Sequence, residues 1–223
     1  MISNSDIIKK TKPAFDGFTS YLQVFFCLMI ASFIAGAPSS IYEAASGNPL
    51  FFELNYGEPL AFTNESIVVS SIILLVVFYL SASIQVGISL FCLNIYNGKG
   101  VNFSTLFGSF NTFKPLAVTI LLTLIIGVGF ILLIIPGIIL GLMYSQAYYI
   151  LAEEPNIGVL EALKKSEKMM KGKKEQLFML TLRAILYFIL GVFTLFIWWI
   201  WLAPRYSVAF AGFYEELKKD FNN

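Results

Sequence analysis

The sequence predicts an all-α membrane protein, a polytopic bundle of six transmembrane helices arranged as tandem hairpins with both termini in the cytoplasm. Hydrophobic residues make up 57% of the 223 residues and charged residues only 13%, about half the charged fraction of a typical soluble domain. The mean hydropathy of +0.76 agrees with this. Long apolar runs recur along the chain, and a helix needs roughly 20 apolar residues to cross a bilayer. We therefore expect residues 1–223 to form a single integral membrane domain.

The first two transmembrane helices are expected over residues 18–41 and 67–95, where the sequence is predominantly apolar. The residues before the first run are polar, so we interpret that run as a membrane anchor and not as a cleavable signal. Residues 42–66 separate the two helices and contain acidic side chains but no lysine or arginine. We expect this segment to be an extracellular acidic loop.

The third and fourth helices are expected within one apolar block, residues 113–152, which is about twice the length needed to span a bilayer. Pro136 and Gly137 interrupt this block. Proline lacks an amide proton and suits the first turn of a helix better than its interior. We therefore expect a hairpin with helices over residues 113–134 and 136–152.

The fifth and sixth helices are expected within a second double-length apolar block near the C-terminus. The break is less marked here, and we place the turn near residues 194–199. Trp198, Trp199 and Trp201 lie at this point, and tryptophan is enriched at membrane interfaces. The predicted helices run over residues 175–193 and 198–217.

The distribution of lysine predicts the orientation, because cytoplasmic segments of membrane proteins are enriched in lysine and arginine. In the six-helix arrangement, the acidic loop and the two outer turns contain no lysine. The predicted cytoplasmic segments contain Lys9, Lys10, Lys12, Lys99, Lys114, Lys164, Lys165, Lys168, Lys171, Lys173, Lys174, Lys218 and Lys219. A four-helix arrangement with re-entrant hairpins gives the same sidedness and is the alternative.

An internal duplication is indicated by similar sequences at an offset of 62 residues. The corresponding segments are Tyr144-Ser145-Gln146-Ala147-Tyr148 with Tyr206-Ser207-Val208-Ala209-Phe210, Glu153-Glu154 with Glu215-Glu216, and Gly129 with Gly191. Each copy is a hairpin that starts and ends in the cytoplasm, so the two copies run parallel. The alternative is chance similarity between aromatic-rich helix ends.

A cytoplasmic amphipathic helix is predicted over residues 156–171, with Asn156 as its N-cap and Gly172 at its end. Its apolar residues recur at helical spacing, and lysines flank them. The stripe and its flanking cations include Val159, Leu163, Met170, Lys164 and Lys168. In one interpretation this helix lies on anionic inner-leaflet lipids or docks a partner. In the other, which we favour, it is a connector that shields the bundle.

A spaced pattern of small and aromatic residues runs through the second half of the chain. Its members are Ile135-Pro136-Gly137-Ile138, Tyr144, Tyr149-Ile150-Leu151-Ala152-Glu153, Ala162-Leu163, Ser166, Met169-Met170, Gly172-Lys173, Phe178, Leu202, Pro204, Phe213-Tyr214 and Leu217. This pattern resembles the bacterial integral-membrane family called domain of unknown function 975. The resemblance implies a multi-pass protein of the cytoplasmic membrane of a Gram-positive bacterium, and it transfers no active site. Arg205 stands where we expect an aromatic residue in that family, and Arg183 where we expect a small one.

Two arginines fall inside predicted transmembrane helices, where a charged side chain is costly and by default indicates function. Arg183 lies roughly 13 Å along its helix at 1.5 Å per residue, and Arg205 lies near the middle of the last helix. In one interpretation both face a cytoplasm-facing polar cavity that binds an anionic group, together with Gln85, Tyr144 and Gln146.

The other interpretation of the two arginines is that their long side chains reach the inner headgroups. They would then pair with glutamates at the inner membrane edge, and the candidates there are Glu153, Glu175 and Glu215. We favour this second interpretation, because reaching the interface lowers the cost of a charge in the membrane.

Small residues at four-residue spacing predict close helix packing. Gly137 and Gly141 form one such pair, and Ser83 and Gly87 form another. We expect them to pack helices within the bundle. Homo-oligomerisation is the alternative.

The residues that carry most enzyme chemistry are missing from the sequence. The chain has no histidine, which removes the commonest metal ligand and general base. Cys27 and Cys92 lie in apolar runs and are interpreted as small buried hydrophobes. No carboxylate pair falls inside a predicted span, and no phosphate-binding glycine loop is present. We therefore expect no enzyme activity, no catalytic residue, no metal and no cofactor.

The partner classes follow from the same composition. A net charge of +1 and the lack of a basic stripe exclude nucleic acid as an expected partner. The lipid bilayer, anionic inner-leaflet lipids and other membrane proteins or a second copy are the expected partners. We rank first a non-enzymatic accessory or partner-binding role in membrane homeostasis or in protection against membrane-active peptides. A small transporter of an anionic or amphipathic solute ranks second, and a lipid-modifying enzyme third.

Overall fold

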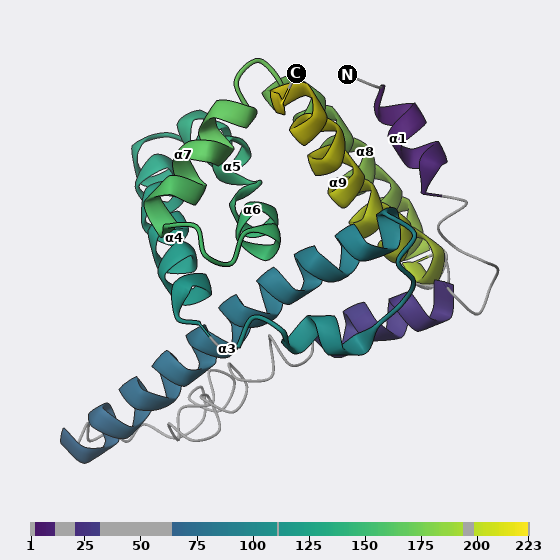
Figure 1. Cartoon of the computed structure of the whole chain (residues 1–223). Coiled ribbons are helices and arrows are strands. Elements are labelled where there is room, and N and C mark those ends of the chain that lie inside the picture. The colour runs from purple at the N-terminus through teal and green to yellow at the C-terminus, as the bar shows by residue number, and fades with distance from the viewer. Residues whose placement is uncertain (1–2, 12–20, 32–63, 111, 194–198, 223) are drawn as a thin grey trace.

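A computed structural model describes most of the chain, and Figure 1 labels its helices. The described residues are 3–11, 21–31, 64–110, 112–193 and 199–222. All but the last residues of the predicted acidic loop, and the predicted turn before Trp199, lie outside them. The regular elements in the described part are all helices, so the all-α prediction is confirmed there.

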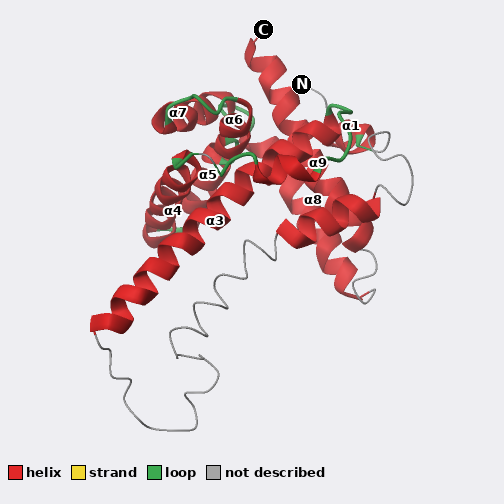
Figure 2. Cartoon of the chain, turned by 60° about the horizontal axis from the view of Figure 1, so that its bottom comes forward, coloured by secondary structure: helices red, strands yellow, loops and turns green. Residues whose placement is uncertain are grey.

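The longest helix, α3 (Asn64–Tyr96), has 33 residues and extends about 50 Å at 1.5 Å per residue. Its C-terminal half packs against several helices and against the short 3-10 helix η1 (Phe103–Phe107). Its N-terminal half projects beyond the other described helices, as Figures 1 and 2 show. α3 is therefore the element on which the two halves of the bundle are assembled.

The N-terminal segment forms the short helix α1 (Asn4–Lys10), which begins after Ser3. The Ser3 hydroxyl accepts a hydrogen bond from the amide of Asp6 at 3.3 Å, as N-cap residues do. The Asn4 side-chain amide donates to the carbonyl of Gln176 at 2.8 Å, which docks α1 on the C-terminal helix pair. A second apolar helix, Tyr21–Ala31, lies within the first predicted transmembrane run.

The α4–α5 hairpin lies where the sequence predicts one. α4 runs over Lys114–Leu132 and α5 over Ile134–Tyr144. Leu133 breaks the helix with φ −165° and ψ 150°, an extended conformation. Pro136 is the third residue of α5, where an amide proton would have no intrahelical partner. The break thus falls three residues before the proline.

After α5 the chain continues as α6 (Ala147–Glu153) and then α7 (Val159–Met169). A two-residue interruption at Ser145 and Gln146 separates α5 from α6, so the predicted fourth helix is broken near its middle. The sequence predicted the amphipathic helix to start near Asn156, and α7 begins after the N-cap Gly158.

The C-terminal pair consists of α8 (Lys174–Phe193) and α9 (Trp199–Asn222), which lie side by side (Figure 1). The Trp199 indole donates a hydrogen bond to the carbonyl of Phe188 at 3.1 Å, which joins the two helices near their connection. Pro204 lies inside α9 and removes one amide donor from its ladder.

Both hairpins make a close approach at positions 62 residues apart. A Cβ on Gly129 would lie 2.7 Å from Leu140 and 3.0 Å from the Cα of Gly137. A Cβ on Gly191 would lie 2.3 Å from the ring of Trp199. The contact between Gly129 and Gly137 in the first hairpin corresponds to the contact between Gly191 and Trp199 in the second. Each residue of the second contact lies 62 residues after its counterpart in the first. This equivalence supports the internal duplication.

Two clusters of buried apolar residues hold these helices together. The larger lies where α3, α6, α8 and α9 meet and includes Phe91, Leu180 and Phe213. The smaller joins α3, α4, α6 and α7 and includes Val118 and Leu163. Both clusters use residues of α3 and α6, so these two helices connect the α4–α7 half of the molecule to the α8–α9 half.

Three helices in the described part are long and apolar enough to cross a membrane: Phe78–Tyr96, Lys114–Leu132 and Ile134–Glu153, the last of which combines α5 and α6. Large apolar side chains cover much of the outer surface. Ile131 at the tip of the α4–α5 hairpin is 85% exposed. A surface of this kind is typical of a membrane protein, whose solvent is lipid.

Candidate anion-binding cavity

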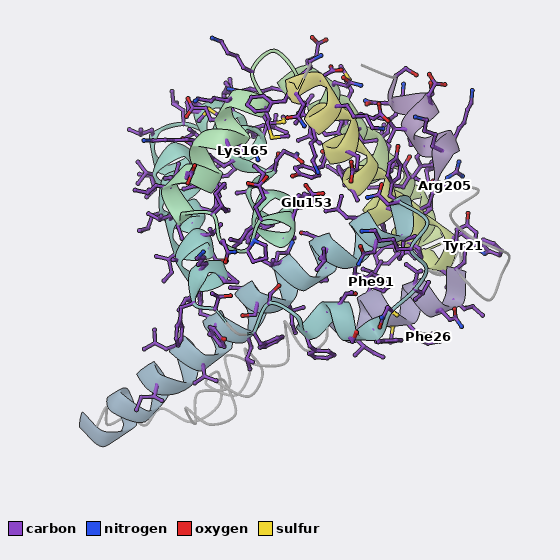
Figure 3. The ribbon with its side chains drawn as sticks, in the orientation of Figure 1. Tyr21, Phe26, Phe91, Glu153, Lys165 and Arg205 are labelled. Atoms are coloured by element: carbon purple, nitrogen blue, oxygen red, sulfur yellow. The ribbon has the colours of Figure 1, made fainter. Side chains whose placement is uncertain are left out.

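Charged and polar contacts gather at one end of the bundle, which we call the charged end. It joins the start of α4 and α8 to the end of α3, α6 and α9, with α1 and α7 beside them. Its members are Lys10, Asn97, Lys114, Glu153, Glu154, Lys165, Lys173, Tyr214, Glu215, Glu216, Lys218, Lys219 and Asp220. Figure 3 shows Glu153 on α6 and Lys165 on α7 within this region.

The acidic pair at the end of α6 is fully engaged at the charged end. Glu153 accepts hydrogen bonds from the Tyr214 hydroxyl at 2.8 Å and from Lys218 Nζ at 2.7 Å. Glu154 forms an ion pair with Lys165 of α7. Burial opposes the charge of Lys218, but its hydrogen bonds and its attraction to Glu153 outweigh this and raise the pKa of Lys218.

The equivalent acidic pair in α9 is engaged in the same way. Glu215 accepts from the Asn97 side-chain amide at 2.7 Å. Glu216 is buried and accepts from both Lys10 and Lys219 at 3.2 Å. The two acidic pairs of the repeat therefore lie at the same end of the molecule, and their carboxylates are occupied by lysine, tyrosine and asparagine side chains.

The two arginines line one cavity of about 690 Å³ between α1, α8 and α9. Arg183 projects from α8 and Arg205 from α9, and Figure 3 places Arg205 near Tyr21. We call this space the arginine cavity. Lys9 of α1 adds a third cation at its rim, where it is largely exposed and lies 3.9 Å from Asp6.

Aromatic side chains form much of the wall of the arginine cavity. Tyr187 and Tyr206 face each other across α8 and α9 with ring centroids 6.0 Å apart. Tyr21 and Trp201 form a second pair at 5.1 Å. The leucines that line α8 and α9 add apolar surface. The cavity thus combines cations with an apolar, aromatic lining.

Among the described residues, neither arginine forms an ion pair. Arg205 Nε is buried and has no hydrogen-bond partner. In the interpretation in which the arginines reach the inner headgroups, their candidate partners are Glu153, Glu175 and Glu215. Glu153 and Glu215 are bound to other side chains, and Glu175 is exposed. A buried cationic donor without a partner is costly, and two guanidinium groups in one cavity repel each other. The arrangement therefore favours an anion between them.

The other polar residues predicted for the cavity lie elsewhere. Gln85 and Gln146 line a separate cavity of about 320 Å³ on the opposite side of the α8–α9 pair, which we call the glutamine cavity. Tyr144 lies half-buried against the smaller apolar cluster. The structure thus brings together Arg183 with Arg205, and Gln85 with Gln146, in two different places.

The predicted small-residue pairs have distinct surroundings. A Cβ on Gly87 would lie 2.1 Å from the carbonyl oxygen of Leu106, so α3 and η1 meet at this position. Gly137 packs against Phe130 of the same hairpin, whereas Gly141 has nothing within 4 Å of such a Cβ. Ser83 is fully buried, and its hydroxyl has no hydrogen-bond partner.

The amphipathic stripe of α7 faces the protein. Leu163 and Met170 are buried, and Val159 is partly buried against the smaller cluster. Lys164 and Lys168 are exposed on the other side. The apolar face therefore covers α4, α5 and α6.

Two features of these sites were not identified from the sequence. The tyrosines and Trp201 of the arginine cavity had no signal that separated them from ordinary membrane aromatics. The Ser166 hydroxyl donates to the carbonyl of Met143 at 2.9 Å and accepts from the amide of Gln146 at 3.3 Å. This role was also missed, because it depends on α7 folding back on the interruption between α5 and α6. A serine on the apolar face of an amphipathic helix was the available clue.

The model of the family described as Protein of unknown function (DUF975) matches residues 125–220. This match confirms the resemblance derived from the sequence pattern. The matched region includes both arginines, both acidic pairs and Gln146. No curated protein and no solved structure shows a significant match to the chain.

Proposed function

We propose that this chain is a non-enzymatic membrane protein that binds an anionic amphipath. The premise is its match to the DUF975 family over residues 125–220. The buried Arg205 Nε, which has no hydrogen-bond partner and lines the same cavity as Arg183, is the observation that carries the proposal. Guanidinium groups match the geometry of phosphate oxygens and bind them through charge-assisted hydrogen bonds. The apolar and aromatic walls suit an acyl chain attached to such a group.

The accessory role follows from this binding chemistry. A protein that holds phosphate-bearing lipids in the inner leaflet would contribute to membrane homeostasis. It would also limit the anionic surface to which membrane-active cationic peptides bind.

The binding proposal is tested with purified protein in nanodiscs, using phosphatidylglycerol, phosphatidylcholine with the same chains, and inorganic phosphate as probes. We expect phosphatidylglycerol to bind preferentially, and Arg205→Gln and Arg183→Gln each to weaken it about tenfold. A charge-assisted hydrogen bond contributes roughly 1.5–3 kcal/mol, and 1.4 kcal/mol is a factor of ten. Lys164→Gln is the control, because it removes an exposed cation that does not line the cavity.

The outcomes separate the possible ligands. Binding of inorganic phosphate with the same arginine dependence would show that the cavity takes a free anion. Equal affinity for phosphatidylglycerol and phosphatidylcholine, or unchanged binding by both arginine variants, would contradict the proposal.

Transport of the same class of molecule is the second candidate function. The arginine cavity extends from Ser5 and Lys9 of α1 to residues 183–190 of α8 and 201–206 of α9. Arginine-dependent movement of a short-chain phosphatidic acid across proteoliposomes would support it. Binding without movement would leave the accessory role.

The proposed topology has six transmembrane helices and cytoplasmic termini. At the charged end, the ion pair Lys10–Glu216 joins α1 to α9, and Lys173, the residue before α8, pairs with Asp220 of α9. These contacts support cytoplasmic placement by the positive-inside rule. The α4 and α5–α6 arms have 19 and 20 residues, about 30 Å each, which matches the hydrocarbon core.

Cysteine labelling tests this topology in a background in which Cys27 and Cys92 are replaced by alanine. We expect Lys171→Cys to react with an impermeant maleimide only after the cells are permeabilised. Leu133→Cys at the hairpin tip should react in intact cells, because six full spans bring the tip to the outer interface. Reaction of Leu133→Cys only from the inside would instead establish the re-entrant, four-helix arrangement.

A further inference from the structure

The glutamine cavity lies at an interruption in a transmembrane helix. α5 ends at Tyr144 and α6 begins at Ala147. Non-helical backbone at membrane depth is tolerated where it is buried in protein or lines a cavity. The freed backbone groups are bound by Ser166 of α7, which donates to the carbonyl of Met143 at 2.9 Å and accepts from the amide of Gln146 at 3.3 Å.

The cavity is lined by uncharged polar groups from four helices. They come from Gln85 of α3, from Ser145, Gln146 and Tyr149 around the interruption, and from Thr181 of α8 and Ser207 of α9. No charged residue is among the described residues that line it. A bound ion would therefore be unneutralised there, which is costly in a low-dielectric interior. The lining favours a neutral, hydrogen-bonding ligand.

Within the glutamine cavity, one hydrogen-bond acceptor, Gln146 Oε1, is without a donor. Gln146 is 2% exposed, and its buried Oε1 has no hydrogen-bond partner, while its Nε2 donates to Ser145 Oγ at 2.8 Å. The Ser145 and Thr181 hydroxyls donate to the carbonyls of Leu142 and Leu177, so their protons are already used. A ligand that satisfies Gln146 must therefore donate a hydrogen bond, as a hydroxyl group does.

An apolar groove adjoins this cavity. It is lined by Ala184, Ile185, Phe188, Ile189 and Trp199, and it shares Thr181 and Phe210 with the glutamine cavity. Its volume is about 470 Å³. Ile185 and Ile189 are about half exposed. An acyl chain can lie in this groove while its headgroup enters the polar cavity.

We propose that the glutamine cavity and the adjoining groove bind an uncharged acylglycerol, with a free hydroxyl of the headgroup donating to Gln146 Oε1 and the acyl chain along α8. The volume of about 320 Å³ is at the small end of ligand pockets and suits a glycerol-sized headgroup. This site is independent of the proposed arginine site, because α8 presents Thr181 and Ala184 to one cavity and Arg183 and Leu186 to the other.

The test uses photoactivatable diacylglycerol and phosphatidic acid with identical chains, incorporated into nanodiscs that contain the full chain. We expect diacylglycerol to cross-link to peptides of the α8 groove, and phosphatidic acid to label this groove less. Gln146→Leu should reduce diacylglycerol labelling about fivefold, the effect of one net hydrogen bond. Thr181→Val is the second variant and should act in the same direction.

Arg205→Gln is the matched control for this site. It should leave diacylglycerol labelling of the groove unchanged, while it lowers the binding of anionic lipid at the arginine cavity. Equal labelling by both lipids, or wild-type labelling of both the Gln146 and Thr181 variants, would overturn the proposal. Failure of the arginine variants to affect anionic lipid would count against the proposed function alone.

Discussion

Ser166→Ala is expected to destabilise the protein by about 2–4 kcal/mol and to loosen α7. Ser166 is fully buried and binds the Met143 carbonyl and the Gln146 amide at the interruption between α5 and α6. Alanine leaves both backbone groups buried without a partner, and each such group costs about 1–3 kcal/mol. Among the described residues, these two hydrogen bonds are the ones that tie α7 to the interruption.

Unfolding of the purified protein in mild detergent by added denaturing detergent measures this loss. Hydrogen–deuterium exchange over residues 143–147 provides a second readout and should become faster in the variant. Lys168→Ala on the exposed face of α7 is the control and should change stability by less than about 0.5 kcal/mol. Wild-type stability and exchange in Ser166→Ala would show that Ser166 does not hold the interruption.

Gly87→Val is expected to disrupt the contact between α3 and η1, at a cost of about 3 kcal/mol or more. A Cβ at this position would lie 2.1 Å from the oxygen and 2.7 Å from the carbonyl carbon of Leu106. Both are backbone atoms, so the overlap cannot be relieved by a change of side-chain rotamer, and one element must move. Overpacking of this kind typically costs 1–3 kcal/mol and occasionally more.

The matched control for Gly87 is Gly127→Val in α4. A Cβ on Gly127 would meet nothing within 4 Å, so the same substitution should be tolerated. Stability is again measured by unfolding in detergent, together with the yield of monodisperse protein. Equal effects at the two glycines would mean that helix propensity, and not the approach of η1, decides the result.

Much of the helical pattern was accessible from the sequence, because membrane insertion leaves a strong local signal. A spanning helix must be apolar over roughly 20 residues, and a proline in the first turn marks where the next helix begins. The α4–α5 break at Leu133 therefore lies close to Pro136. The interruption at Ser145 and Gln146 had no such marker, since neither residue breaks a helix by its own backbone preference.

The candidate site was accessible only in part. Arg183 and Arg205 stood out because a charge in an apolar run is costly wherever it lies. The other residues that line the arginine cavity could not be deduced, because the sequence does not show which polar residues face the arginines. Gln85 and Gln146 were predicted there and lie in a different cavity. The two arginines and the two glutamines lie on different sides of the α8–α9 pair. Glu153 binds Tyr214 of α9, and Glu215 binds Asn97, the residue after α3.

The sequence by itself determined that this protein is helical and that much of its surface is apolar, because both follow from local composition and residue spacing. Tertiary structure alone decided which polar groups meet and which stay unpartnered. Hydrogen bonding and ion pairing act over about 3 Å between residues that are far apart in the chain. The buried Arg205 Nε without a hydrogen-bond partner, and Gln146 Oε1 without a donor, exist only once the helices have packed.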